Sequence, residues 1–465
     1  MMDRFIFIII VPLIILCLLL GGISGLAVWL FCLIIAYRVG YGINKKNSID
    51  NYSGKILFNS FVIISFVGFL LVLDNINNYG TQFGYAGDDG RFYDNIIALL
   101  ENQGSEESGV FERIFSVVVW CIERPMFTHA DLLDILPFNW LLGALVCYLS
   151  YELLCKIGNK RYPIWIIYFS LILNYNFIDS VVRLYRDGLL YVFYLAAIIS
   201  IDKKDYIRSQ FYILGAGVMR GANAFLLLSL LFIRFLNEKV KSKILVSISI
   251  IGVVSVVVYN INIYGPQVFN YASDYFRSSR YSSAFAGYSL NEVYESRQNA
   301  LSGSLDESTV TAKIYQNEGI ISIIGKPAIS FFFPLRMVSL VSNKESHSYK
   351  AQINSTRNFN FYNLYIDATI FSWVLVFPLF LIGLYNSLLL SDMKFVLAIY
   401  YLFTLFMVAH ISGQMRHGLA FIVLTPIFVG YGLELYGSVP KCKKQVISIG
   451  VLTVIGIILF NTMSI

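Results

Sequence analysis

The stretch RFIFIIIVPLIILCLLLGGISGLAVWLFCLIIAY, residues 4–37, carries a single charge, at its first position. Two apolar halves, 5–20 and 24–38, are separated by a pair of glycines. A helix of about 20 apolar residues crosses a hydrocarbon core of about 30 Å, so the two halves are predicted to be the first two membrane-spanning helices. A secretory signal peptide is disfavoured, because no small-residue cleavage site opens into a soluble chain.

The rest of the 465 residues follows the same pattern. Hydrophobic residues make up 57% and charged residues 14%, whereas soluble chains carry about 25% charged residues. A closed barrel needs alternating strands of about ten residues, and runs such as 244–259 do not alternate. We therefore predict an all-α polytopic membrane protein with one transmembrane domain over 1–465 and about 11–13 transmembrane helices.

Charge and cysteine content exclude other classes. The 35 Lys and Arg against 29 Asp and Glu give a net charge of +6, but the basic residues gather in short connections, which reports topology and not a nucleic-acid partner. The six cysteines form no CxxC or Cys/His spacing, so neither a disulfide framework nor a zinc site is predicted.

Apolar runs define the predicted spans, with boundaries good to a few residues. Beyond the first two, they are 56–75, 133–155, 162–179, 188–201, a broken pair at 209–218 and 221–236, 244–263, 364–385, 393–410, 417–436 and 445–461.

Alternate connections between these spans are rich in lysine and arginine, and by the positive-inside rule they face the cytoplasm. This assignment of sides requires the broken pair to enter the membrane and return to the same side as two short passes. The opposite face then receives two long segments, 76–132 and 264–363, together with the short turns at 183–187 and 412–417. Parts of the second long segment are expected to lie on the membrane as helices. No internal repeat is visible, which disfavours an inverted-repeat transporter.

The first group with chemical potential is the run YAGDDGRFYDN, shortly after the third span. A carboxylate pair at Asp88 and Asp89 can accept a proton from a sugar hydroxyl or hold a divalent ion. The alternative is a solvated turn that leads into an amphipathic helix.

The second group is IDSVVRLYRDGLL. Arg183 and Arg186, three positions apart, would lie on one helical face and present two planar forks to phosphate oxygens. The alternative is an ion-pair network, Asp179 with Arg183 and Arg186 with Asp187, that only anchors a helix end.

Arg220 in GVMRGANAF and the pair Arg416 and His417 in HISGQMRHGLAFIVLTP complete the candidates. An arginine at membrane depth indicates function by default. The histidine can act as a base beside an anion-binding arginine, although an interfacial histidine is more often a hydrogen-bonded anchor. In the long loop only Arg336 and His347 are singled out.

Together these motifs resemble the bacterial oligosaccharide repeat-unit polymerases (O-antigen polymerases) of surface polysaccharide and lipopolysaccharide biosynthesis, and more distantly the polyprenyl-dependent glycosyltransferases of the GT-C type. The matching features are GDDGRFY, VRLYRDGLLYVFYL, MRGANAFLLL, the long loop and MRHGLAFIVLTP. The resemblance implies a multi-pass protein of the bacterial inner membrane with its active site on the periplasmic side. Undecaprenyl-diphosphate-linked oligosaccharide would be donor and acceptor, a chain-length regulator protein a further partner, and no cofactor or metal would be needed.

In this interpretation four arginines bind the diphosphate, and one of three residues accepts the proton of the attacking hydroxyl. The arginines are Arg183, Arg186, Arg220 and Arg416, and the proton acceptors are Asp88, Asp89 or His417. Arginines stabilise charge that develops on the leaving diphosphate. The alternatives are a GT-C transferase that uses a polyprenyl-phosphate sugar and, third, a flippase for lipid-linked oligosaccharide.

Overall fold

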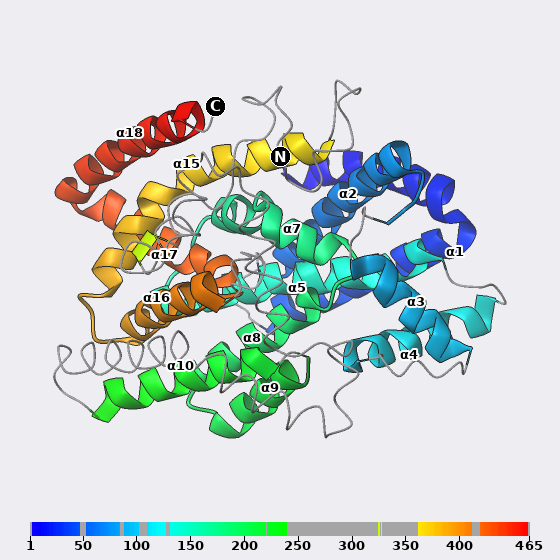
Figure 1. The fold of residues 1–465 in the computed structure, drawn as a ribbon, viewed down its shortest axis with the longest axis horizontal. Helices are drawn as coiled ribbons and strands as arrows, with labels where there is room; N and C mark the ends of the chain where they lie inside the picture. The colour runs from blue at the N-terminus through cyan, green and yellow to red at the C-terminus, as the bar shows by residue number, and fades with distance from the viewer. Residues whose placement is uncertain are drawn as a thin grey trace.

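The computed structural model is a helical bundle (Figure 1). It describes residues 2–46, 53–83, 88–101, 109–126, 131–219, 221–239, 324–325, 327, 361–411 and 419–463. No β-strand occurs among these residues, which confirms the all-helical prediction for the described part of the chain. The predicted span 244–263 and nearly all of the loop 264–363 lie outside them.

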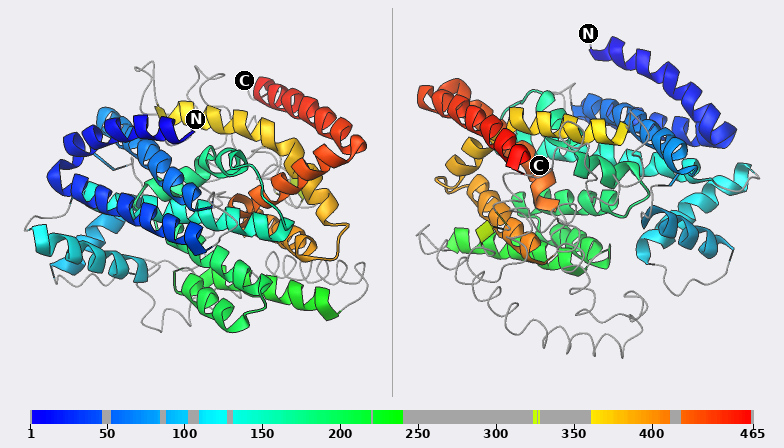
Figure 2. Two further views of the ribbon diagram at one scale, coloured as in Figure 1. Left: turned by 180° about the vertical axis from the view of Figure 1, so that it is seen from behind. Right: turned by 45° about the horizontal axis from the view of Figure 1, so that its top comes forward.

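The two predicted N-terminal spans form one continuous helical element, α1 (Met2–Lys46). It is interrupted at Gly22, whose φ of 62° and ψ of −157° are open to glycine and not to residues with a Cβ. Two arms meet at this bend (Figure 2). α1 packs on α2 (Ser53–Tyr79), and Gly40 approaches the backbone of Gly54 closely. The double glycine that separates the apolar halves in sequence therefore also bends the helix.

The centre of the bundle is α5 (Leu132–Gly158), which packs against α1, α2 and α8 (Asp187–Asp202). Its start is held by a capping box in which the Asp131 carboxylate accepts from Leu132 N–H and Asp134 accepts from Asp131 N–H. α2 runs antiparallel to it, with the ring of Trp140 directly over Gly68.

The predicted span 162–179 is broken. It consists of α6 (Trp165–Ile167), the π-helix η1 (Tyr168–Ile172) and α7 (Tyr175–Val182), and the two halves meet at 77°. Asn174 begins the second half, because its side-chain oxygen accepts hydrogen bonds from the N–H groups of Asn176 and Phe177. The apolar run did not reveal this break, because the segment was predicted as one span over 162–179.

The backbone groups released at the break are satisfied by side chains of a distant helix, α15 (Phe361–Ser387). Thr369 accepts from Tyr175 N–H at 2.9 Å, Ser372 donates to Phe169 C=O at 2.6 Å, and Tyr365 donates to Ile172 C=O. Non-helical backbone at membrane depth persists only where protein groups satisfy it in this way.

The predicted broken pair is observed as α9 (Tyr206–Met219) and α10 (Gly221–Lys239), which pack on each other. Further along the chain, α15 packs on α17 (Leu419–Ser438) with Gly383 and Gly432 at the crossing, where any Cβ would overlap the backbone of the other helix. α16 (Met393–Ile411) lies between α10 and α17, and α18 (Pro440–Met463) covers α15 and α17.

Basic connections meet at one end of the bundle. Lys156 at the end of α5 pairs with Asp202 at the end of α8, at 2.6 Å, and Lys204 pairs with Glu238 at the end of α10, at 3.4 Å. Lys160 pairs with Glu434 near the end of α17, at 3.0 Å. These connections were predicted to share one face, and the ion pairs join them at what we call the basic end.

The predicted first long segment contains two helices at the opposite end, α3 (Asp88–Leu100) and α4 (Val110–Met126). They pack on each other through Phe92 and Phe111, whose ring centroids are 5.4 Å apart.

Within the described residues, four helical stretches are long and apolar enough to cross a membrane, or five if the bent pair is one span. The four are Ile9–Gly42, Gly54–Asn77, Leu132–Gly158 and Asp367–Ser387. These apolar helices indicate that the chain is a membrane protein.

Candidate functional site

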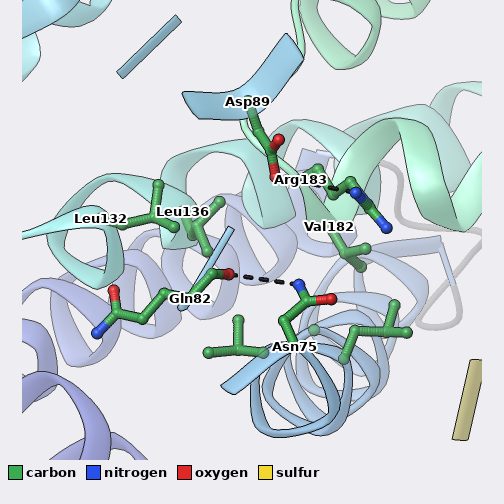
Figure 3. Close-up of a pocket in the computed structure, with 10 residues that line it drawn as sticks. Asn75, Gln82, Asp89, Leu132, Leu136, Val182 and Arg183 are labelled. Atoms are coloured by element: carbon green, nitrogen blue, oxygen red, sulfur yellow. Dashed lines mark hydrogen bonds and ion pairs between the residues drawn. The ribbon is translucent and has the colours of Figure 1, made fainter. Parts of the chain in front are cut away.

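Two of the predicted sequence groups meet away from the basic end. Asp89, at the start of α3, lies with its Oδ2 3.9 Å from Nη1 of Arg183, and Oδ1 of Asp179 lies 2.8 Å from Nε of Arg183. Figure 3 shows Asp89 directed toward Arg183. We call Asp89, Asp179 and Arg183 the ionic cluster. One aspartate of the GDDGRFY run therefore lies beside one of the candidate arginines.

Arg183 and Arg186 do not lie on one helical face, contrary to the expectation from their spacing. α7 ends at Val182, Arg183 is extended with φ −91° and ψ 165°, and Arg186 precedes the first turn of α8. Two side chains of α5 cause this ending. Trp140 Nε1 donates to Val182 C=O at 3.0 Å, and Asn139 Nδ2 donates to Arg183 C=O.

Asn139 also explains the glycine that opens α8. A Cβ on Gly188 would come within 2.9 Å of Asn139 Oδ1. Asn139 is fully buried, so its amide is a fixed part of the turn and not a surface group. The turn between α7 and α8 is therefore shaped by α5.

The ionic cluster is enclosed, with exposed fractions of 3% for Asp89, 8% for Asp179 and 7% for Arg183. Burial alone would lower the pKa of the Arg183 guanidinium, but the carboxylates of Asp179 and Asp89 raise that pKa above its ordinary value. Arg183 is thus a permanent cation between two carboxylates. Of the two ion pairs in the predicted anchoring network, the one between Asp179 and Arg183 is present.

Arg186 connects the cluster to the broken pair. Its Nη1 donates to the carbonyl of Met219, the last residue of α9, at 3.4 Å. Met219 immediately precedes Arg220 in the chain, and Arg220 itself lies outside the described residues. The end of α9 is therefore next to the turn that carries Arg183 and Arg186.

A narrow crevice, with room for about one water molecule, adjoins the cluster. Its walls are formed by α2, α5, the α7–α8 turn and the start of α3, and one side is apolar (Figure 3). The polar side is lined by Asn75, Gln82, Asp89 and Arg183. Asn75 Nδ2 donates to Gln82 C=O at 3.3 Å, and Gln82 Nε2 donates to the Asp131 carboxylate at 3.2 Å, so both amides are held in place.

The length of α5 gives the distance of the ionic cluster from the basic end, and hence its depth relative to a membrane. The Asn139–Trp140 step that holds Arg183 is 16–17 positions from Lys156 at the basic end, or about 25 Å at 1.5 Å per residue. A hydrocarbon core is about 30 Å thick. If the basic end lies at one membrane surface, the cluster lies near the opposite hydrocarbon boundary, about two helical turns inside the start of α5.

The other predicted residues are not placed by the structure. Asp88 opens α3, but its side chain lies outside the described residues, as do Arg220, Arg336, His347, Arg416 and His417. Among the described residues, no group of three or more His, Cys, Asp or Glu side chains is suited to a metal ion.

Sequence reasoning missed Asn75, Gln82, Asn139 and Trp140. A signal was available for Asn139, because a buried amide in an apolar span needs a hydrogen-bond partner. Which partner it finds depends on the end of α7, which periodicity does not predict.

No protein-family model, curated protein or solved structure matches the chain.

Proposed function

We propose that the protein is a membrane-embedded glycosyltransferase that polymerises undecaprenyl-diphosphate-linked oligosaccharide repeat units, as for O-antigen or a related surface polysaccharide, on the periplasmic face of the bacterial inner membrane. The observation that carries the proposal is the approach of Asp89 to Arg183. It brings a carboxylate and a guanidinium from two separate sequence motifs to one point.

The proposed reaction needs both groups. The acceptor hydroxyl oxygen attacks the anomeric carbon, the bond from that carbon to the diphosphate oxygen breaks, and the hydroxyl proton passes to a base. Negative charge develops on the leaving diphosphate, where arginines stabilise it. Asp89 serves as the base and Arg183 as one anion-binding group, and direct displacement inverts the anomeric centre.

The geometry of the cluster supports a division of labour between its carboxylates. The 2.8 Å contact of Asp179 holds Arg183 in place, whereas the 3.9 Å contact of Asp89 is beyond hydrogen-bonding distance. A phosphate oxygen can therefore compete with Asp89 for the guanidinium. The level of the cluster also suits a lipid-linked diphosphate, whose head group lies at the hydrocarbon boundary.

The remaining candidates extend the same proposal. Arg186, Arg220 and Arg416 would bind further diphosphate oxygens, and Asp88 and His417 are alternative bases. The connection from Arg186 to Met219 supports the inclusion of Arg220, its neighbour in the chain.

The surface glycan of a deletion strain tests the function. Complementation by the native protein should give a ladder of repeats, and the deletion should leave lipid capped by a single repeat. Complete loss of glycan would instead favour an earlier step, either a GT-C transferase with a polyprenyl-phosphate donor or a flippase. An unchanged glycan profile would contradict all three functions.

Asp89→Asn should abolish the ladder with normal protein levels in the membrane, because the amide cannot accept the proton. Asp94→Asn is the matched control, since Asp94 lies on the same helix and is exposed. Full ladders from Asp89→Asn would remove Asp89 from the reaction and move the base to Asp88 or His417.

A further inference from the structure

An exposed apolar stripe runs along α4. Four large side chains repeat at helical spacing, three or four positions apart, and all point outward. They are Val110, Ile114, Val117 and Trp120, with exposed fractions of 39%, 41%, 61% and 49%. A helix that faced water on this side would carry polar residues there.

The opposite face of α4 is already used. Phe111, Phe115 and Val119 are buried, and the ring of Phe111 packs against Phe92 of α3. The stripe is therefore not the core-facing side of the α3–α4 pair, and another apolar surface must cover it.

The helix that carries the stripe contacts the helical bundle. α4 touches α9 and lies beside it on one flank (Figures 1 and 2). α9 presents its own apolar stripe, Ile207, Phe211 and Leu214, with exposed fractions of 85%, 69% and 67%. α9 contains the first pass of the predicted broken pair, 209–218, for which lipid is the expected surrounding medium.

The contact made by the start of α3 indicates the depth of the α3–α4 pair relative to the membrane. Asp89 is in contact with Arg183, which lies about 25 Å from the basic end along α5. If the basic end lies at one membrane surface, the α3–α4 pair begins near the opposite hydrocarbon boundary. The stripe includes Trp120, and tryptophan is enriched at this boundary.

We propose that α4 inserts its apolar stripe into the lipid bilayer at this boundary, so that the occupant of the stripe is lipid and not water or a second protein. The predicted external segment 76–132 is then partly embedded, and the base of the ionic cluster is carried on a membrane-anchored pair of helices. This membrane contact stands independently of the proposed glycosyl transfer.

Single probes on the full-length protein in liposomes test the contact. An environment-sensitive fluorophore is attached to Val117→Cys in a Cys121→Ser background, because Cys121 is also exposed on α4. Emission should shift to the blue, and phospholipids spin-labelled near the head of the acyl chain should quench it severalfold more than aqueous iodide does. Asp94→Cys, on the exposed polar side of α3, is the matched control and should show the reverse.

Two outcomes would overturn the proposal. Equal iodide quenching at the Val117 and Asp94 probes would place the stripe in water. A blue-shifted Val117 probe that lipid does not quench, together with a disulfide between two Val117→Cys chains, would show that a second copy covers it. Neither readout depends on enzymatic activity. A negative result for the lipid contact of α4 therefore leaves the proposed glycosyl transfer untouched, and the reverse also holds.

Discussion

Arg183 is the residue on which the site depends. Arg183→Lys keeps the charge but loses the planar fork that meets Asp179 and the substrate anion. Losing one preorganised donor costs on the order of 3 kcal/mol, or about a hundredfold in rate. We expect shortened or absent glycan ladders at normal expression. Arg208→Lys is the control, because Arg208 is exposed and pairs only with the neighbouring Asp205 among the contacts described here. A full ladder from Arg183→Lys would reduce this arginine to an anchor.

The two carboxylates of the cluster should differ in what they support. Asp179→Asn removes the 2.8 Å ion pair and leaves a buried guanidinium poorly compensated, which costs about 3–5 kcal/mol. The more distant Asp89 contributes less to that compensation, so Asp89→Asn should lower activity far more than stability. Thermal unfolding of both variants in detergent separates these effects. Equal losses of Tm would contradict the division of labour.

At the level of single residues, the sequence predicted candidate side chains but not their geometry. Asp89 and Arg183 were candidates from their separate motifs, and the structure brings them within 3.9 Å of each other. The prediction that Arg183 and Arg186 share one helical face was wrong, because hydrogen bonds from Asn139 and Trp140 of α5 accompany the end of α7 at Val182, before either arginine. Long-range hydrogen bonds of this kind leave no periodic signal in the local sequence.

At the level of elements, the broken crossing formed by α6, η1 and α7 depends on α15. Thr369→Val removes the acceptor used by Tyr175 N–H, and losing a partner for a buried donor costs about 1–3 kcal/mol. Thr404→Val is the control, because that buried hydroxyl bonds only to carbonyls of its own helix in the described structure. We expect a clear drop in Tm for the first variant and a small one for the second. Similar drops would show that the α15 contact is not specific.

The crossing of α15 and α17 gives a second element-scale test. A Cβ on Gly383 would overlap the carbonyl oxygen of Phe428, so Gly383→Ala must push the two helices apart. Gly437→Ala on α17 is the control, because nothing lies within 4 Å of its Cβ position. Folded, monodisperse protein should be recovered in lower yield from the first variant alone. Equal yields would mean that the crossing relaxes freely.

At the level of the whole molecule, the helical arrangement predicts a topology. Cysteines introduced at Asn159 and Lys203, both exposed at the basic end, should react with a membrane-impermeant maleimide only after the cells are opened. A cysteine at Asp94 should react in intact spheroplasts, as should cysteines at Asn102 and Ser302 in the two long segments. Labelling of Asn159→Cys and Asp94→Cys from the same side would overturn the orientation.

The positions of many helices were predictable, because long apolar runs mark candidate membrane helices. The predicted 133–155 and 364–385, for instance, are observed as Leu132–Gly158 and Phe361–Ser387. The break at Asn174 and the close crossing at Gly383 were not predictable, since both are set by side chains or backbone of other helices. The number of helices that cross the bilayer is supported only for the four or five described above.

The dependence of the broken crossing on α15 has a consequence for biogenesis. The chain is made from its N-terminus, so α6, η1 and α7 leave the ribosome long before Tyr365, Thr369 and Ser372 exist to satisfy their released backbone groups. Lipid offers no substitute for those partners. We therefore infer that this segment waits in the insertion machinery or at the membrane surface until α15 has been synthesised, so that a truncation before Phe361 would be recognised by membrane quality control at α7 itself.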